Sequence, residues 1–291
     1  MPASLSPAQA AAYCRDGFLF PIDVMDRAEA AKWCARVEAL EADYPDGSLP
    51  QPLNQYFRIN GQVVLPLMAE IARHPAVLDA VQSILGPDLL VWSCELFIKE
   101  PNTPKIVSWH QDLTYWGMGE TDEQVTAWIA LSPATRQSGC MMFVAGSHNN
   151  RIVEHRDTFH ADNLLSRGQE IAVEVDEKDA TDVVLQPGQM SLHHGRMFHA
   201  SGPNVSDDRR IGCAIRYVTP GVKQLVGERD YAMLVRGCDT MRNWVNVAPP
   251  ASAFDADAMS LYNRIMQDQS AALTAGATQT VGLYAGGEQR I

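Results

Sequence analysis

The segment Ser108-Trp109-His110-Gln111-Asp112 places an imidazole and a carboxylate two positions apart. In an extended chain, residues two apart project to the same side, so His110 and Asp112 can point at one atom. These groups are two of the three ligands in the facial triad of non-haem Fe(II) oxygenases. A His-x-Asp pair also occurs by chance on polar strand edges, so this interpretation needs a second histidine from another strand.

His199 supplies that second histidine much later in the chain, and Arg210 follows it at the start of an expected strand. An arginine at this place can form a bidentate pair with a carboxylate of a bound cosubstrate. The sequence therefore suggests a metal centre with an anion-binding residue nearby. The rest of the chain must form elements that bring these residues together.

The three parts of the chain differ in pattern. Residues 1–88 have helical features: Ser6 and Asp26 are typical N-caps, and helices are expected over Ala8–Arg15, Arg27–Ala42 and, interrupted near Pro75, Leu67–Leu85. Over residues 89–220, β-rich runs alternate with turn residues, namely Leu89–Lys99, Val125–Leu131, Cys140–Val144, Asp182–Leu185, Gln189–His194 and Ile211–Val218. Residues 221–291 contain an expected helix, Ala256–Gln269, and a loose tail over 275–291. This pattern predicts one domain, mainly β with flanking helices.

The order of the motifs resembles the phytanoyl-CoA dioxygenase family of Fe(II)- and 2-oxoglutarate-dependent oxygenases. The resemblance covers about residues 89–220. It includes the Trp-His-Gln-Asp run at 109–112, the Ala-Trp pair at 127–128, the Gly-Ser-His turn at 146–148, and the series His199, Ser201, Asn204 and Arg210. It implies a double-stranded β-helix, a jelly-roll-like barrel, for the core. Several motifs in the right order make it far more specific than any one of them.

The resemblance implies a metal site and a reaction. His110, Asp112 and His199 are expected to be both catalytic and ligands of Fe(II). With a carboxylate at position 112, hydroxylation is expected rather than the halogenation of relatives that have a small residue there. The expected enzyme is a dioxygenase that hydroxylates a small molecule with O₂, while 2-oxoglutarate is decarboxylated to succinate and CO₂.

The resemblance also implies a cosubstrate site. Arg210 and Ser201 are expected to bind the distal carboxylate of 2-oxoglutarate, and Gln111 and Trp128 are expected to line its site. Alternation alone puts the larger apolar side chains of this strand on the side of Arg209, the neighbouring residue. Arg210 is still preferred, because its spacing from His199 matches the family. Arg209 is expected to face solvent beside Asp207 and Asp208.

The other histidines are expected not to bind the metal. His194 matches a family position that is not a ligand, so a place in the core or behind the ligands is expected. His193 should point to the opposite side of its strand. His148, His155 and His160 fall in expected loops, where a solvated surface position is the default.

The residues that recognise the substrate are less clearly indicated. Candidates are the aromatic residues around the first metal motif and a polar-aromatic segment expected to cover the barrel opening, namely Tyr56, Arg58, Trp109, Tyr115 and Trp116. Such aromatics can equally belong to a core. A small polar metabolite is expected, with a quaternary amine, an aminophosphonate and a natural-product intermediate left open. An acyl-CoA would favour a more basic surface.

Composition limits the possible partners. With 23 Lys and Arg against 35 Asp and Glu, the net charge of this 291-residue chain is -12, which argues against nucleic-acid binding. No apolar run is long enough for a transmembrane helix. The six cysteines are scattered, without the spacing of a zinc site or a disulfide framework. A cytoplasmic protein is expected, and its oligomeric state stays open.

Two other classes of function use the same ligands. One is a metal-binding barrel without catalysis that acts as a sensor or scaffold. The other is a cupin-like isomerase or hydrolase that does not use 2-oxoglutarate. The intact triad, Arg210 and Trp128 together argue against the inactive barrel. Arg210 distinguishes the cupin-like enzyme from an oxygenase, because a cupin needs no anchor for a cosubstrate carboxylate.

Overall fold

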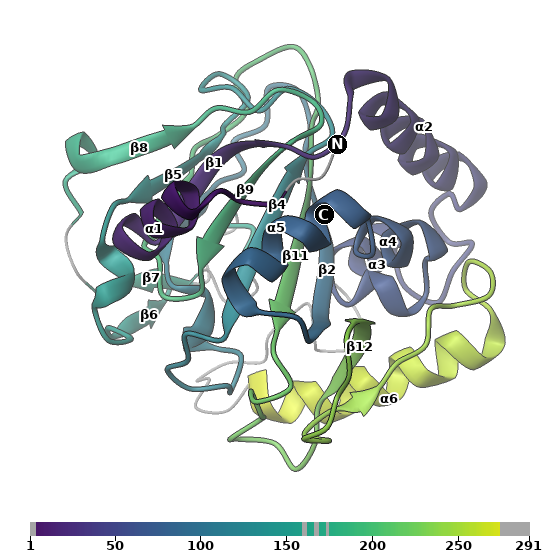
Figure 1. Cartoon of the computed structure of the whole chain (residues 1–291). Helices are drawn as coiled ribbons and strands as arrows, with labels where there is room; N and C mark the ends of the chain where they lie inside the picture. The colour runs from purple at the N-terminus through teal and green to yellow at the C-terminus, as the bar shows by residue number, and fades with distance from the viewer. Residues whose placement is uncertain (1–3, 159–161, 166–168, 173–174, 274–291) are drawn as a thin grey trace.

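The computed structural model describes residues 4–158, 162–165, 169–172 and 175–273 (Figure 1). The expected tail over 275–291 lies outside these residues. The helices are α1 (Pro7–Asp16), α2 (Arg27–Asp43), α3 (Leu53–Arg58), α4 (Pro66–Ile71), α5 (Pro75–Leu85) and α6 (Ala256–Leu273), with short 3₁₀ turns η1 (Gly61–Val63), η2 (Asp112–Thr114), η3 (Ser147–Asn149) and η4 (Glu177–Asp179).

The predicted helix starts are confirmed. The side chain of Ser6 accepts a hydrogen bond from the backbone N–H of Gln9, and the side chain of Asp26 accepts one from Glu29. The break expected near Pro75 is also present, because α4 ends before this proline and α5 begins at it. Ser6 and Asp26 therefore fix where α1 and α2 begin.

The strands of the described chain form three sheets. Strands β1 (Phe18–Asp23), β9 (Gln189–His194), β4 (Gln124–Ala130), β11 (Arg210–Val218), β2 (Leu89–Lys99), β12 (Tyr231–Arg236) and β13 (Val245–Asn246) lie in this order in a seven-stranded major sheet. Strands β3 (Val107–His110), β10 (His199–Ser201), β5 (Met141–Val144) and β8 (Ala180–Val183) form a four-stranded minor sheet, and β6 (His155–Asp157) pairs with β7 (Gln169–Ile171).

The major and minor sheets together enclose one cavity. Its lining includes Trp128 and Arg210 from the major sheet and Met141, His199 and Ser201 from the minor sheet. Two mainly antiparallel sheets that face each other, with helices outside, confirm the predicted double-stranded β-helix class.

Helices cover the outer face of the major sheet. Figure 1 shows α5 lying in front of the central strands, and α3 and α4 beside β2. Alternate residues of β11, including Ile211, Cys213 and Ile215, pack into the core beneath these helices, while Ala214 faces the other way. Every residue of β11 is buried, so both of its faces are inside the protein. No described helix has the length and apolar character needed to cross a membrane.

Candidate functional site

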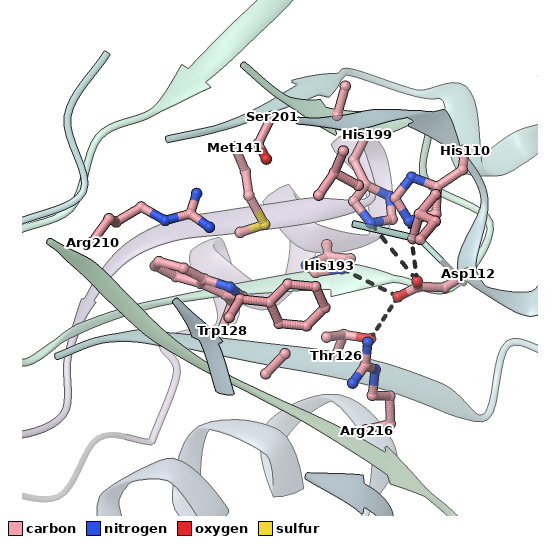
Figure 2. A pocket seen from close by; sticks show the side chains of 15 residues that line it. His110, Asp112, Thr126, Trp128, Met141, His193, His199, Ser201, Arg210 and Arg216 are labelled. Atoms are coloured by element: carbon pink, nitrogen blue, oxygen red, sulfur yellow. Dashed lines mark hydrogen bonds and ion pairs between the residues drawn. The ribbon is translucent and has the colours of Figure 1, made fainter. Parts of the chain in front are cut away.

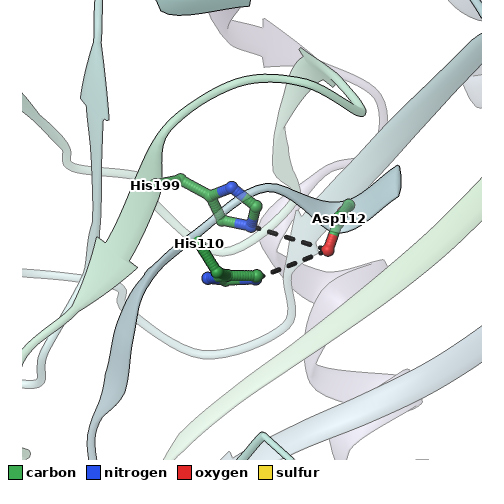
Figure 3. A group of neighbouring side chains, drawn as sticks. All are labelled: His110, Asp112 and His199. Atoms are coloured by element: carbon green, nitrogen blue, oxygen red, sulfur yellow. Dashed lines mark ion pairs between the residues drawn. The ribbon is translucent and has the colours of Figure 1, made fainter. Parts of the chain in front are cut away.

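Two neighbouring strands of the minor sheet bring the candidate metal ligands together. Strands β3 and β10 are antiparallel, and His199 is paired directly with His110. Asp112 follows at the start of η2. The ligand atoms of these three buried residues all lie within 4.8 Å of one another (Figure 3). The predicted convergence of residues that are distant in sequence is therefore present.

Backbone contacts leave the same nitrogen free on both imidazoles. Nδ1 of His110 donates to the carbonyl of Ser108 at 2.8 Å, and Nδ1 of His199 donates to the carbonyl of Met197 at 3.0 Å. A carbonyl can only accept, so each Nε2 keeps a lone pair for a metal. These two nitrogens lie 3.4 and 3.8 Å from Oδ1 of Asp112. Two imidazoles and a carboxylate around one point fit a ferrous ion.

The two carboxylate oxygens of Asp112 have different surroundings. Oδ1 faces the imidazoles of His110 and His199, whereas Oδ2 accepts a hydrogen bond from the hydroxyl of Thr126 at 3.2 Å. Nε2 of His193 also lies near this oxygen, 3.6 Å from Oδ2. This arrangement directs one oxygen toward the metal position and holds the other away from it.

The protonation states of this cluster suit a metal. Burial would raise the pKa of the Asp112 carboxyl, but the imidazoles of His199, His110 and His193 and the guanidinium of Arg216 hold that pKa well below its ordinary value. Burial, followed by the proximity of His110, lowers the pKa of His199 well below its ordinary value. At neutral pH, an ionised carboxylate therefore faces a neutral His199 imidazole, as metal binding requires.

Two buried basic residues lie at the far end of the cavity, Arg210 in its lining and Lys99 beside it. Arg210 is 1% exposed, and its guanidinium lies 5.4 Å from the centre of the Trp128 ring (Figure 2). Lys99 is fully buried, and its Nζ donates to the hydroxyl of Ser201 at 2.8 Å and to the carbonyl of Gly202. Neither cation has a carboxylate partner in the described part of the chain. Two basic side chains without a carboxylate partner, Arg210 in the cavity lining and Lys99 bonded to the lining residue Ser201, offer a site for an anion.

Sequence reasoning missed Lys99. It is paired with Arg210 in the register of β2 and β11, so the two side chains lie next to each other on the cavity face. A signal was present in the alternation of Ser93, Glu95, Phe97 and Lys99 along an otherwise apolar strand. Burial, then the charge of Arg210, lowers the pKa of Lys99 to about 6.

This pKa predicts how stability depends on pH without 2-oxoglutarate. Because the pKa in the folded protein lies below the ordinary 10.5, the unfolded chain binds the extra proton between about pH 6 and 10.5, and stability rises with pH across this window. Lys99→Met should remove this contribution. Urea midpoints at pH 6.5 and 9 should rise more in wild type than in the variant, and equal rises would contradict the assignment.

Trp128 and Ser201 line the cavity as predicted. The Trp128 ring lies directly on Gly212, where a Cβ atom would overlap its six-membered ring. Glycine at this position therefore lets the indole lie flat against β11, between Arg210 and the metal position.

Arg210 and Arg209 face opposite sides of the major sheet. Arg210 lines the cavity, and Arg209 forms ion pairs with Glu41 at 2.7 Å and Glu100 at 2.8 Å. The expectation that Arg209 lies beside Asp207 and Asp208 was wrong, because helix α2 brings Glu41 over this edge of the sheet. The apolar residues in phase with Arg209 pack beneath the helices, which explains the misleading alternation.

Gln111 does not line the cavity, in contrast to the prediction. Its Nε2 donates to the carbonyls of Arg196 at 2.9 Å and Arg151 at 3.3 Å, and its Oε1 accepts from the N–H of Val153 at 2.9 Å. Because it lies between two residues that point inward, its side chain points outward. There the Gln111 side chain links the loop of the first metal motif to the neighbouring backbone by hydrogen bonds. The backbone N–H of Gln111 also donates to Nε2 of His155 at 3.1 Å.

Tyr56 was predicted to be at the substrate site, and this was wrong. It is 1% exposed on α3, in contact with the rings of Phe254 and Tyr262. The local sequence gave no sign of these partners, because they come from the end of the chain. Arg58, on the same helix, contacts the Phe97 ring at 4.1 Å, next to the cavity.

The aromatic residues of the first metal motif surround the cavity without lining it. Trp116 packs on Trp92 at 4.9 Å between ring centres, and Tyr115 meets His155 edge-on at 5.5 Å. Trp109 is half-buried, between the inward-facing Val107 and His110. Their roles at a substrate site stay predictions.

The histidine pair on β9 is arranged differently from the expectation. The two do face opposite sides, but His193 is the one that lines the cavity and approaches Asp112. His194 is buried elsewhere, where its Nε2 donates to Asp122 at 3.1 Å. His148 was expected on the surface but is 7% exposed, with its Nε2 donating to the carbonyl of Cys14. His160 lies outside the described residues.

The fold and the site define a β-helix with a candidate metal triad at one end of a cavity and an anion site at the other. A family model for phytanoyl-CoA dioxygenase (PhyH) matches residues 13–212. The solved structure of ThoJ, titled a non-heme monooxygenase, is 35% identical with a TM-score of 0.80, and the match covers 92% of this chain and 98% of ThoJ. The chain belongs to the phytanoyl-CoA dioxygenase family.

Other relatives are more distant. A Caenorhabditis elegans protein named a probable phytanoyl-CoA dioxygenase is 26% identical over 158 residues, which are 52% of this chain and 51% of that protein. The chain thus spans about half the length of this curated relative. The structure titled CytC3 with Fe(II) and alpha-ketoglutarate shares the fold, with 22% identity and a TM-score of 0.63 over 86% of this chain and 98% of that one.

Proposed function

We propose that this chain is an Fe(II)- and 2-oxoglutarate-dependent dioxygenase that hydroxylates a small molecule. The observation that carries the proposal is that the His110, Asp112 and His199 triad and Arg210 line one cavity, with Lys99 bonded to the lining residue Ser201. A five-carbon keto dianion that binds a metal at one end needs a cationic partner at the other. Family membership supports the same assignment.

The side chains have distinct roles in this proposal. His110, Asp112 and His199 would hold ferrous iron through their two imidazole Nε2 atoms and one carboxylate oxygen. Arg210 and Lys99 bind the distal carboxylate, the Ser201 hydroxyl orients Lys99, and the Trp128 ring fills the wall between the two ends. When bound, iron and 2-oxoglutarate supply the O₂ activation that hydroxylation requires, with succinate and CO₂ as coproducts. The buried side chains of the lining limit the access of water to the reacting groups.

The two alternatives from the sequence are less well supported. Neither an inactive metal barrel nor a cupin-like enzyme needs two buried cations facing the metal across a cavity. Burying such cations without an anion is unfavourable, so a protein with no use for that anion would gain from replacing them by apolar residues.

Succinate formation tests the proposal. The purified protein, incubated with Fe(II), O₂ and 2-oxoglutarate, should release succinate slowly alone and faster with a substrate from a panel of small metabolites. Omission of Fe(II) is the control and should stop the release. If 2-oxoglutarate neither binds nor is decarboxylated although the metal is bound, one of the two alternatives is correct.

A further inference from the structure

One buried cation of the cavity has no part in the proposed cosubstrate site. Arg216 lies on the same strand and cavity face as Arg210, about 20 Å further along β11. Its direct neighbour on β4 is Thr126, whose hydroxyl donates to Asp112. Arg216 therefore lies at the metal end, while Arg210 lies beyond Trp128 (Figure 2). A 2-oxoglutarate that reaches from the metal to Arg210 leaves Arg216 uncovered.

The guanidinium of Arg216 is only partly satisfied. Its Nη1 lies 2.8 Å from Oε1 of Glu95, and that oxygen also accepts the hydroxyl of Ser93 at 3.1 Å. Nε of Arg216 has no hydrogen-bond partner among the described residues, although the side chain is only 8% exposed. A buried cation with an unused donor is unfavourable unless another acceptor arrives. Arg216 thus has donor capacity left over at the cavity wall.

Apolar side chains line the cavity beside Arg216. Its guanidinium carbon lies 5.8 Å from the ring centre of Phe97, which lines the cavity together with Ala214. Trp116, whose ring centre lies 5.4 Å from the same carbon, packs on Trp92 outside the lining. Phe97 and Ala214 offer apolar surface next to a cation, and this combination suits a molecule with an apolar body and an anionic head.

We propose that Arg216 binds a carboxylate of the substrate, which is therefore an organic acid with an apolar body. The inference rests on the proposed function and names the substrate class of the same cavity. It disfavours the quaternary amine left open by the sequence, because a cationic head would face both Arg216 and the metal. Placing the carboxylate at Arg216 brings the adjoining carbons next to the metal position beside Asp112.

Calorimetric titration with matched probes tests this inference. The protein is loaded with Mn(II), which does not turn over, and saturated with 2-oxoglutarate. It is then titrated with butyrate and 3-phenylpropionate, and with the primary amide and the primary amine of each skeleton. The two acids should bind at least ~10-fold more tightly than the amides, because a charge-assisted pair is lost in the amides, and the amines should bind most weakly.

Variants identify the residue responsible. Arg216→Gln should weaken acid binding ~10-fold or more, and Arg216→Lys should weaken it less. Glu95→Gln, the matched control, removes the competing carboxylate and should leave acid binding equal or tighter. Affinities for Mn(II) and 2-oxoglutarate are measured first in each variant, so that acid binding is compared with both sites saturated. If Arg216→Gln does not fold, the inference is tested by the comparison of acids with amides in the wild-type protein and by acid binding to Glu95→Gln.

Several outcomes would overturn the inference. These are amides or amines that bind as tightly as the acids, acids that do not bind, and acids that bind Arg216→Gln as tightly as wild type. In each of these cases normal binding of 2-oxoglutarate would leave the proposed function standing. Failure of the wild-type protein to bind 2-oxoglutarate would instead remove the proposed function and this inference with it.

Discussion

Replacing His199 by alanine should abolish retention of iron and stop 2-oxoglutarate-dependent succinate formation. His199 supplies one of three ligand atoms that lie within 4.8 Å of one another, and its Nε2 is free because Nδ1 donates to Met197. In metal sites, removing a residue that only hydrogen-bonds to a ligand typically lowers metal affinity about 10–100-fold. Removing a ligand itself should therefore lower the affinity more than ~100-fold. Iron content after Fe(II) loading and dialysis measures the effect directly.

The matched control for this variant is His194→Ala. His194 is also a buried histidine, but its ring contacts Asp122 and lies outside the cavity. This variant should keep its iron, which separates loss of a ligand from loss of a buried imidazole. Full iron retention by His199→Ala would contradict the assignment and make His193, 3.6 Å from Asp112, the next candidate ligand.

Arg210→Ala should raise the KM for 2-oxoglutarate by about 10- to 100-fold, because a charge-assisted pair in a buried site contributes roughly 1.5–3 kcal/mol. Burial lowers the pKa of Arg210 to about 10, so it remains charged at neutral pH. Lys99 remains in the variant and keeps part of the anion site. Initial rates of succinate formation at varied 2-oxoglutarate concentrations give the KM.

Arg209→Ala is the control for this second variant. Its ion pairs with Glu41 and Glu100 lie on the helix side of the sheet, so the KM should stay near that of wild type. A larger rise in KM for Arg209→Ala than for Arg210→Ala would show that Arg209, and not Arg210, binds the carboxylate of 2-oxoglutarate. An unchanged KM in both would favour a function without 2-oxoglutarate.

Most strands and the His110–Asp112 pair could be predicted because they depend on local periodicity, whereas the complete ligand set with His199 followed from the resemblance to the family. His110 and Asp112 share a side because they are two apart, and strands such as Leu89–Lys99 and Gln189–His194 begin and end as expected. The fold class followed from a resemblance that includes several motifs. The order of the motifs and the alternation of inward- and outward-facing residues can both be recognised in the sequence without knowing which strands pair.

Features that depend on pairing between distant strands could not be predicted. Lys99 becomes an anion-binding residue only because β2 and β11 pair in a register that puts it beside Arg210. Tyr56 looked like a residue of an open loop, yet the partners that bury it, Phe254 and Tyr262, come from the chain's other end. His193 was assigned to the wrong environment, because alternation separates it from His194 without showing which side faces the cavity.

The contrast between the buried cations and the acidic exterior has a consequence for kinetics. A chain of net charge -12 repels a dianion at long range, and the attraction of Lys99 and Arg210 begins only near the cavity. Salt screens the distant repulsion more than the buried contacts, because the Debye length is about 8 Å at physiological ionic strength. The bimolecular association of 2-oxoglutarate, followed by stopped flow, should therefore accelerate as salt is added to a dilute buffer.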